Sequence, residues 1–282
     1  MVNYRIRVLE VGYVEQFPAD FSFDGYFLAG ETMFSPFSMT LLQGGGKNIL
    51  VDCGIDLGNP VKQGIYESSG ATNGHGPGEV LATVGLAPED IDAVIMTHLH
   101  WDHAGGAACY PNAVFYLQKA ELEQWELIAE EPAWRALSLL CMDLGDLKTF
   151  RELESGGRLI LLEGEEDDLF PGISIRVSSF AHSFAQQMAY VEHDAGVHLI
   201  VGDVCNRPEN LTGTEECPFF LPNPKFSVGG LANAVVDYER IMGWVNGDTN
   251  RVVMAHDGTR RGRYPEVKTE LGLSVYEITA GA

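Results

Sequence analysis

The residues best suited to chemistry lie between positions 98 and 103, where three histidines and one aspartate follow an apolar run at 93–97. The run has the composition and length of a buried strand. His98 and His100 share one face of an extended segment and could bind one metal ion, while Asp102 and His103 could bind a second. Imidazole and carboxylate together favour Zn, Fe or Mn over Ca or Mg. Because the chain has only 8 histidines in 282 residues, this density predicts a metal site.

The segment HLHWDH resembles the H-x-H-x-D-H signature of the metallo-β-lactamase superfamily. Further segments resemble that family in the family's own order, at 49–54, 181–183, 201–203 and 255–257. The resemblance implies an α/β (α+β) fold, the four-layer αβ/βα sandwich in which two packed mixed sheets are flanked by helices. It also implies that residues 1–282 form a single domain.

The same resemblance implies seven metal ligands and one supporting carboxylate. The ligands of the first ion are His98, His100 and His182, and those of the second are Asp102, His103 and His256. Asp203 bridges both ions, and Asp52 orients a ligand from behind. Two Zn²⁺ per chain are expected, with Mn, Fe or Co as alternatives because His/Asp sites accept all of these. Each ion keeps an open position for water, and two cations sharing that water favour hydroxide near neutral pH.

The segment at 182–188, HSFAQQM, is similar to the H-S-P-G-H-Q-S segment of N-acyl-homoserine lactone lactonases, which are quorum-quenching enzymes. It departs from that pattern at 184–186, and Asn206 stands where those enzymes have a tyrosine. We therefore predict a dinuclear zinc hydrolase that opens a lactone or a similar cyclic ester or amide. The metal-bridging hydroxide attacks the carbonyl, Asp102 passes a proton to the leaving group, and Asn206 hydrogen-bonds the substrate.

Two other hydrolase types use the same metals and stay open: a thioesterase of the hydroxyacylglutathione hydrolase type, and a phosphotriester or phosphodiester hydrolase. A basic cluster follows His256 and could be a solvated turn or an anchor for a substrate carboxylate; it consists of Arg260, Arg261 and Arg263. A non-enzymatic binding module is not expected, because all seven ligands are present.

Aromatic residues near the proposed ligands predict an apolar pocket for a small-molecule substrate. They are Trp101, Phe34, Phe219 and Phe220. The last three lie in two stretches, 13–37 and 205–230, that contain several prolines and glycines and are expected to be loops. Whether these stretches form a lid, a pocket wall or a dimer contact stays open, as does a homodimer.

Elsewhere the alternation of apolar and polar residues predicts strands intermixed with helices along the whole chain. Strands are expected at 4–11, 38–43, 48–52, 93–97, 114–117, 158–162, 173–178, 187–191, 198–201 and 252–254. Helices are expected at 79–84, 119–129, 133–153 with a break at Gly145, and 231–245.

The charge balance excludes several partners. With 18 Lys and Arg against 40 Asp and Glu, the net charge is −22, which argues against nucleic acid and anionic lipid. The five cysteines lack a C-x-x-C pair and read as reduced thiols. The sequence has no apolar run near the ~20 residues of a membrane span, and its N-terminal residues do not resemble a signal peptide. A cytoplasmic protein with no membrane partner is expected.

Overall fold

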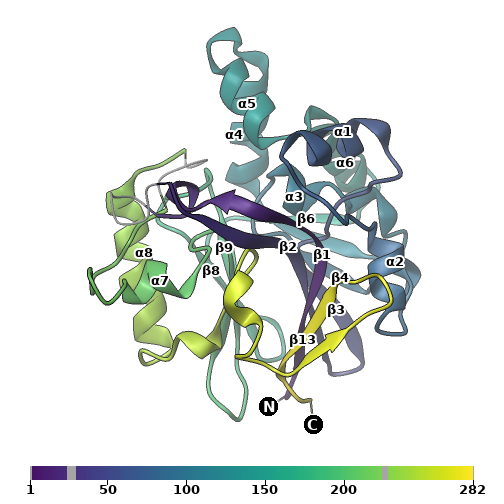
Figure 1. Ribbon diagram of the computed structural model, residues 1–282. Helices are drawn as coiled ribbons and strands as arrows, with labels where there is room; N and C mark the ends of the chain where they lie inside the picture. Colours follow the sequence, from purple (N-terminus) through teal and green to yellow (C-terminus); the bar gives the residue numbers. More distant parts are fainter. Residues whose placement is uncertain (1, 24–29, 224–227, 282) are drawn as a thin grey trace.

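The computed structural model describes residues 2–23, 30–223 and 228–281. Two mixed sheets pack face to face, and helices cover the outer face of each (Figure 1). The larger sheet has the strand order β12-β13-β1-β2-β3-β4-β5-β6, and the smaller has the order β11-β10-β9-β8-β7. The strands β3 to β6 run parallel, as do β10 and β11, while the other pairs are antiparallel.

The strands of the larger sheet are β1 (Arg5–Pro18), β2 (Thr32–Gly44), β3 (Lys47–Val51), β4 (Ala93–Ile95), β5 (Val114–Gln118), β6 (Leu159–Leu162), β12 (Glu266–Lys268) and β13 (Ser274–Thr279). Those of the smaller sheet are β7 (Glu166–Phe170), β8 (Ile173–Val177), β9 (Gln187–Val191), β10 (His198–Gly202) and β11 (Val252–Met254).

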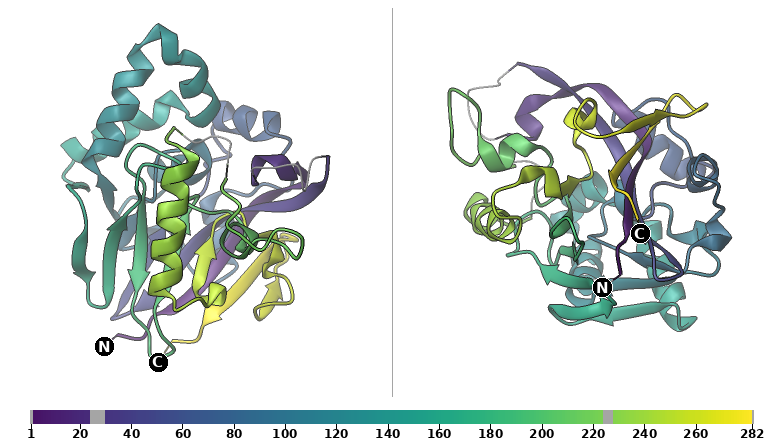
Figure 2. Two further views of the ribbon diagram at one scale, coloured as in Figure 1. Left: turned by 90° about the vertical axis from the view of Figure 1, so that its left-hand side faces the viewer. Right: turned by 90° about the horizontal axis from the view of Figure 1, so that it is seen from below.

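The helices on the larger sheet are α1 (Pro60–Ser68), α2 (Pro77–Ala82), α3 (Trp101–Ala104), α4 (Lys119–Glu130), α5 (Arg135–Cys141) and α6 (Leu144–Ser155). The smaller sheet carries α7 (Pro208–Thr212) and α8 (Leu231–Trp244). Figure 2 shows α8 lying along the smaller sheet, and α4 and α5 projecting beyond the sheets. No described helix combines the length and apolarity that a membrane span requires.

Three apolar layers hold these four layers of structure together. Strand β1 contributes Leu9 and Val11 to the core under the helices, and Ile6 and Val8 to the core between the sheets. Because successive side chains of a strand point to opposite faces, a strand buried on both faces is apolar throughout. A third core joins the smaller sheet to α7 and α8. The four-layer sandwich predicted from the sequence is confirmed.

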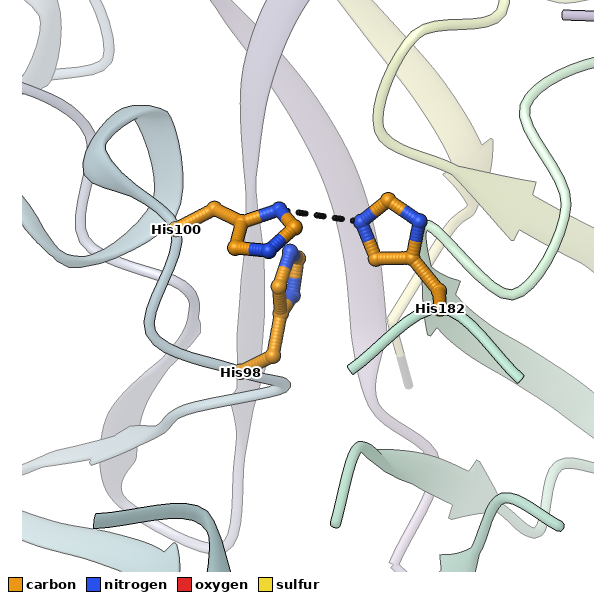
Figure 3. Close-up of side chains that lie close together, drawn as sticks. All are labelled: His98, His100 and His182. Atoms are coloured by element: carbon orange, nitrogen blue, oxygen red, sulfur yellow. Dashed lines mark hydrogen bonds between the residues drawn. The ribbon is translucent and has the colours of Figure 1, made fainter. Parts of the chain in front are cut away.

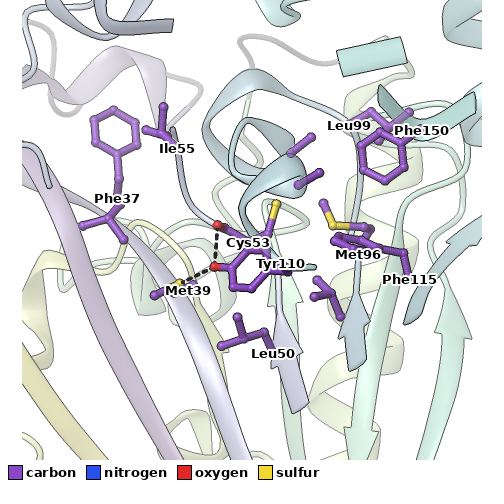
Figure 4. Packing of buried hydrophobic residues seen from close by; sticks show 14 of the residues in the cluster. Phe37, Met39, Leu50, Cys53, Ile55, Met96, Leu99, Tyr110, Phe115 and Phe150 are labelled. Atoms are coloured by element: carbon purple, nitrogen blue, oxygen red, sulfur yellow. Dashed lines mark hydrogen bonds between the residues drawn. The ribbon is translucent and has the colours of Figure 1, made fainter. Parts of the chain in front are cut away.

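The core under the helices also fixes the turn that follows β3. Tyr110 is fully buried among Leu50, Met96 and Phe115 (Figure 4). Its hydroxyl donates a hydrogen bond of 2.9 Å to the carbonyl oxygen of Cys53. This bond anchors the backbone immediately after Asp52, a residue of the candidate site.

The predicted loop at 13–37 is wrong at 13–18 and 32–37, because β1 continues to Pro18 and β2 begins at Thr32. Tyr13 pairs with Pro36, and Phe17 with Met33. A register shift between Val14 and Phe17 marks an irregularity in this pairing, and irregular or edge positions are where strands tolerate proline. The part of the prediction at 24–29 lies outside the described residues.

Other differences have local causes. The break in the predicted helix at 133–153 falls before Gly145, because the Asp143 side chain accepts the Gly145 N–H at 2.9 Å and caps α6. The stretch 205–230 contains α7. Strand β7, whose sequence is EDDLF, lacks the apolar pattern of a buried strand because it lies at the edge of its sheet. Charged side chains on an edge strand discourage pairing with other chains. Three further elements, α1, β12 and β13, are not predicted by the sequence pattern.

Candidate metal centre

The predicted ligands come from four chain segments that meet at one end of the two sheets. The first segment follows β4 and enters α3, so it carries the signature histidines and Asp102. His182 lies between β8 and β9. Asp203 comes directly after β10, and His256 shortly after the neighbouring parallel strand β11. Because parallel strands end at the same edge of a sheet, Asp203 and His256 are brought together.

His98, His100 and His182 form the first cluster (Figure 3). All three are buried, and their ligand atoms lie within 4.8 Å of one another. Nε2 of His182 is 3.0 Å from Nδ1 of His100. Two nitrogens bound tetrahedrally to one zinc ion lie about 3.3 Å apart. The rings therefore already have nearly the separation of two ligands of one ion.

Asp102, His103 and His256 form a second cluster of the same kind. Nε2 of His256 lies 3.3 Å from a carboxylate oxygen of Asp102, and Nε2 of His103 lies 3.5 Å from it. These three residues match the predicted ligands of the second ion.

The Asp203 carboxylate lies between the two clusters. One of its oxygens is 3.5 Å from Nε2 of His182 and 3.2 Å from Nε2 of His256, and the other is 3.3 Å from Nε2 of His103. A carboxylate that contacts histidines of both clusters has the position required to bridge two ions.

Partners behind the rings fix the orientation of three histidines. Nδ1 of His103 lies 2.7 Å from Asp52, and Nδ1 of His256 donates to the carbonyl oxygen of Pro36 at 2.8 Å. Nδ1 of His98 lies 2.9 Å from the Thr97 hydroxyl. Metal-binding histidines generally have such a partner on the second ring nitrogen.

Several polar atoms of the clusters are buried without a hydrogen-bond partner among the described residues. Three of them face the clusters, namely Nε2 of His98, Nε2 of His103 and Oδ1 of Asp203, whereas Nε2 of His100 and Nδ1 of His182 are the ring nitrogens on the far side of those rings. Leaving a buried polar group unpaired costs roughly 1–3 kcal/mol, so the three that face the clusters indicate a missing binding partner. Imidazole and carboxylate donors suit Zn, Mn, Fe or Co, and the residues therefore fit a pair of such ions.

The electrostatics prepare the first cluster for a cation. Burial lowers the pKa of His98 and His100 well below the usual value, and that of His182 to about 4. These imidazoles are therefore neutral at pH 7, and each has a lone pair for a metal ion.

The second cluster is held together by charge. Burial opposes ionisation of Asp203, but the adjacent His256 and His103 hold the pKa of its carboxyl well below the usual range. Burial likewise opposes protonation of His256, but Asp203 and Asp102 raise its pKa to about 10. A metal ion that binds here replaces the imidazole proton as the partner of the carboxylates.

A cavity of about 1010 Å³ opens onto both clusters. Trp101, Asp102 and Asn206 are among the residues that line it. Oδ1 of Asn206 is buried without a partner, while its backbone N–H donates to the Asn210 side chain at 2.9 Å. The Asn206 backbone is therefore held by Asn210, and its side chain lies at the cavity with an unpaired acceptor oxygen.

The other three predicted pocket aromatics are not among the described residues that line the cavity. Phe34 packs on Tyr13, with ring centroids 5.1 Å apart, and Phe220 on Tyr238 at 5.8 Å. Phe219 is 72% exposed. Their places are taken by apolar residues of β1, β2, the 3-10 turn after β1, α1 and α5, namely Val14, Phe17, Phe21, Phe37, Ile65 and Leu140. The sequence signal for some of them was the aromatic stretch 13–37, which contains Phe17, Phe21 and Phe37.

The basic cluster after His256 serves the fold. Arg260 is buried and donates to the Met254 carbonyl oxygen, Arg263 pairs with Asp257 at 2.9 Å, and Arg261 lies over the Phe34 ring. None of the three is among the residues that line the cavity.

The protein combines a four-layer sandwich with buried His/Asp clusters at one end of its sheets. The clusters, rather than the fold alone, place it in the class of metallohydrolases. The family model of the Metallo-beta-lactamase superfamily matches residues 35–238, and the chain belongs to that superfamily. Family membership and the relatives described next indicate a metal-dependent hydrolase.

The curated relatives include N-acyl homoserine lactonases. The chain is 31% identical over 102 residues to one from Bacillus sp, covering 33% of this chain and 41% of the relative. It is 28% identical over 153 residues to one from Bacillus thuringiensis, covering 54% and 53%. The chain thus spans about half the length of these relatives or less.

Solved structures share the fold over nearly the whole chain. A variant of B. thuringiensis AiiA with N-decanoyl-L-homoserine bound has a TM-score of 0.66 at 21% identity, covering 94% of this chain and 98% of that one. AidC, a dizinc quorum-quenching lactonase in complex with the product N-hexanoyl-L-homoserine, has a TM-score of 0.62 at 16% identity, covering 100% and 99%. At these identities the likeness shows the fold.

Proposed function

We propose that the protein is a dinuclear zinc-dependent hydrolase that opens a neutral lactone, or a similar cyclic ester or amide, with an apolar substituent. His98, His100 and His182 hold one ion, and Asp203 is shared between the two. The ligands of the other ion are Asp102, His103 and His256. The names of the relatives support acyl-homoserine lactones as the first substrates to test, and quorum quenching as the role.

The observation that carries the choice of substrate is the charge of the cavity. No lysine or arginine is among the described residues that line it. A glutathione thioester or a phosphodiester is anionic, and sites for such groups use Arg or Lys to balance the charge. A largely apolar wall with a few convergent polar groups instead suits a neutral substrate that carries a chain or ring.

The residues around the cavity divide the remaining work. When bound, the two ions activate water as a nucleophile and polarise the substrate carbonyl. Asp102 lines the cavity and carries a proton to the leaving oxygen. The Asn206 amide donates a hydrogen bond to the substrate carbonyl, in the position where the lactonases have a tyrosine. Trp101 lies against Phe37, with ring centroids 5.5 Å apart, and forms part of the wall that excludes water.

A substrate panel tests the proposal. The zinc-loaded protein is assayed with acyl-homoserine lactones, other lactones, cyclic amides, a glutathione thioester, a phosphodiester and a neutral phosphotriester at equal concentrations. We expect kcat/KM to be highest for a lactone with an apolar substituent. A thioester, a phosphodiester or a phosphotriester that exceeds every cyclic ester and amide by orders of magnitude would overturn the assignment.

A further inference from the structure

A buried carboxylate that is not a metal ligand joins the two loops that hold the first ion's histidines. Glu121 lies in the first turn of α4 and has no exposed surface. Its Oε1 accepts the N–H of Leu99 at 3.1 Å, and its Oε2 accepts the N–H of Ala185 at 2.7 Å. Leu99 stands between His98 and His100, and Ala185 lies three residues after His182. One side chain therefore fixes both backbones.

Two side-chain donors complete this arrangement. The Ser183 hydroxyl donates to Oε1 of Glu121, and so does Nε1 of Trp125, at 2.8 Å. The Trp125 ring stands edge-on to the His100 ring, with centroids 5.5 Å apart. The carboxylate thus also holds the aromatic ring that packs against a proposed ligand.

The four groups around Glu121 are all donors, and only an ionised carboxylate offers acceptors alone. Hydrogen bonds to a charged acceptor are shorter and stronger than neutral ones. An amide in the same place would turn an N–H toward one of the donors. It would leave at least one buried donor without an acceptor, and the two loops would lose a common anchor.

The arrangement parallels the support of the second cluster. Asp52, after β3, accepts from His103 and from the Thr97 backbone N–H. Glu121, from α4, reaches the first cluster through the backbone around its ligands. Asp52 thus contacts the second cluster directly and reaches His98 only through the Thr97 hydroxyl, while Glu121 is bonded to the segments of the first cluster alone.

We propose that Glu121 is a positioning residue that holds His98, His100 and His182 in place for the first metal ion, an inference that rests on the proposed dinuclear site. The expected effect is selective, because the hydrogen bonds of Glu121 within the described residues go to Leu99, Ser183, Ala185 and Trp125 and none to a ligand of the second ion. Loss of its charge should weaken binding of the first ion and leave binding of the second ion unchanged.

The test is a titration of metal-free protein with Co²⁺, followed by absorption in the visible range and by calorimetry. In Glu121→Gln we expect one of the two binding events to weaken by about 10- to 100-fold, as is typical when a support behind a ligand is lost. The second event and its spectrum should keep their wild-type values. Glu123→Gln, an exposed position on the same helix, is the matched control and should bind both ions normally.

Two further variants keep the test decisive if Glu121→Gln fails to fold. Trp125→Phe and Ser183→Ala each remove one donor and keep the carboxylate, and each should weaken the same binding event by a smaller factor. Wild-type affinity for both ions in Glu121→Gln, or in both donor variants when Glu121→Gln is unfolded, would overturn the proposal. A wild-type protein that binds two ions but opens no lactone would contradict the proposed function alone, because this readout needs no substrate.

Discussion

Nδ1 of His103 lies 2.7 Å from one carboxylate oxygen of Asp52, whose other oxygen accepts the backbone N–H of Thr97 at 2.8 Å. This pair joins the turn after β3 to the loop after β4, and it directs Nε2 of His103 toward Asp102 and Asp203. Asp52 holds this position with a left-handed backbone, φ 62°. Aspartate and asparagine tolerate that conformation better than most residues.

Asp52→Asn should therefore weaken binding of the second metal ion, while the strain of the left-handed backbone stays small. Asparagine keeps the shape and the tolerance of positive φ but loses the charge that holds the His103 ring. We expect about a 10- to 100-fold loss of affinity for that ion, measured by Zn²⁺ titration of metal-free protein. Asp52→Ala should lose the same affinity and also stability in urea. Unchanged zinc affinity in Asp52→Asn would contradict the role of this pair.

Gly202→Ala should disrupt the approach of β10 to the site. Gly202 has φ 54°, and an added Cβ would lie 2.5 Å from Oγ1 and 2.8 Å from Cβ of Thr97. Left-handed strain costs about 1–2 kcal/mol and overpacking about 1–3 kcal/mol, so the free energy of unfolding should fall by about 2–5 kcal/mol. Gly243→Ala in α8, where no atom lies within 4 Å of the added Cβ, is the control and should be neutral or stabilising. Equal stability of the two variants in urea unfolding would argue against the described packing.

Lys62→Met should destabilise the protein more at pH 8 than at pH 5. Lys62 and Asp146 form a buried ion pair 2.6 Å apart. Burial raises the pKa of Asp146 to about 6 even though Lys62 lowers it. Without Lys62 this pKa rises further, so at pH 5 the carboxyl is neutral and costs little. At pH 8 it must either stay charged and unpaired or take up a proton.

The expected loss at pH 8 is about 3–5 kcal/mol, the usual penalty for an unpaired buried charge, and it should shrink as the pH falls below 6. Chemical denaturation at the two pH values measures it. Lys148→Met removes an exposed lysine paired with Glu152 and should change stability by less than about 1 kcal/mol at either pH. A penalty for Lys62→Met that is independent of pH would exclude the linkage to Asp146.

How much of the site could be predicted depended on whether the information was local. The spacing of His98, His100, Asp102 and His103 is local and identified a metal site directly. His182, Asp203 and His256 lie far apart in the chain, and only resemblance to a family could join them to it. The alternation of apolar runs and turns predicted strands intermixed with helices, because buried strands leave that pattern. The four-layer sandwich itself followed only from the resemblance to a family.

The cavity wall and Glu121 depended on tertiary contacts that no local pattern records. Phe34 and Phe17 belong to the same aromatic stretch, but the pairing of β1 with β2 places Phe17 on the cavity and Phe34 against Tyr13. Glu121 lies at the start of an amphipathic helix, where a carboxylate is normally solvated. Its burial becomes visible only when the loops around Leu99 and Ala185 close over it.

Phe17→Ala should lower activity toward lactones with a long acyl chain more than toward those with a short one, if the cavity binds the acyl chain. Removing this ring takes contact area from the wall, which we expect to lower kcat/KM for a decanoyl lactone by about 10-fold, since such losses in apolar pockets cost about 1–3 kcal/mol. The butanoyl lactone should change much less. Phe219→Ala, at an exposed position outside the cavity lining, is the control and should leave both values unchanged. Equal losses for both chain lengths would contradict this assignment of the wall.

The central claim, a lactone hydrolase that depends on two bound metal ions, is tested most directly by measuring metal content and lactone hydrolysis on the same samples. Protein purified without chelator is analysed by mass spectrometry for metals, stripped, and then titrated with Zn²⁺ while hydrolysis of an acyl-homoserine lactone is followed. We predict that activity disappears on stripping and returns in full at two zinc ions per chain. Well under one metal per chain, with no hydrolysis restored by zinc, would contradict the account.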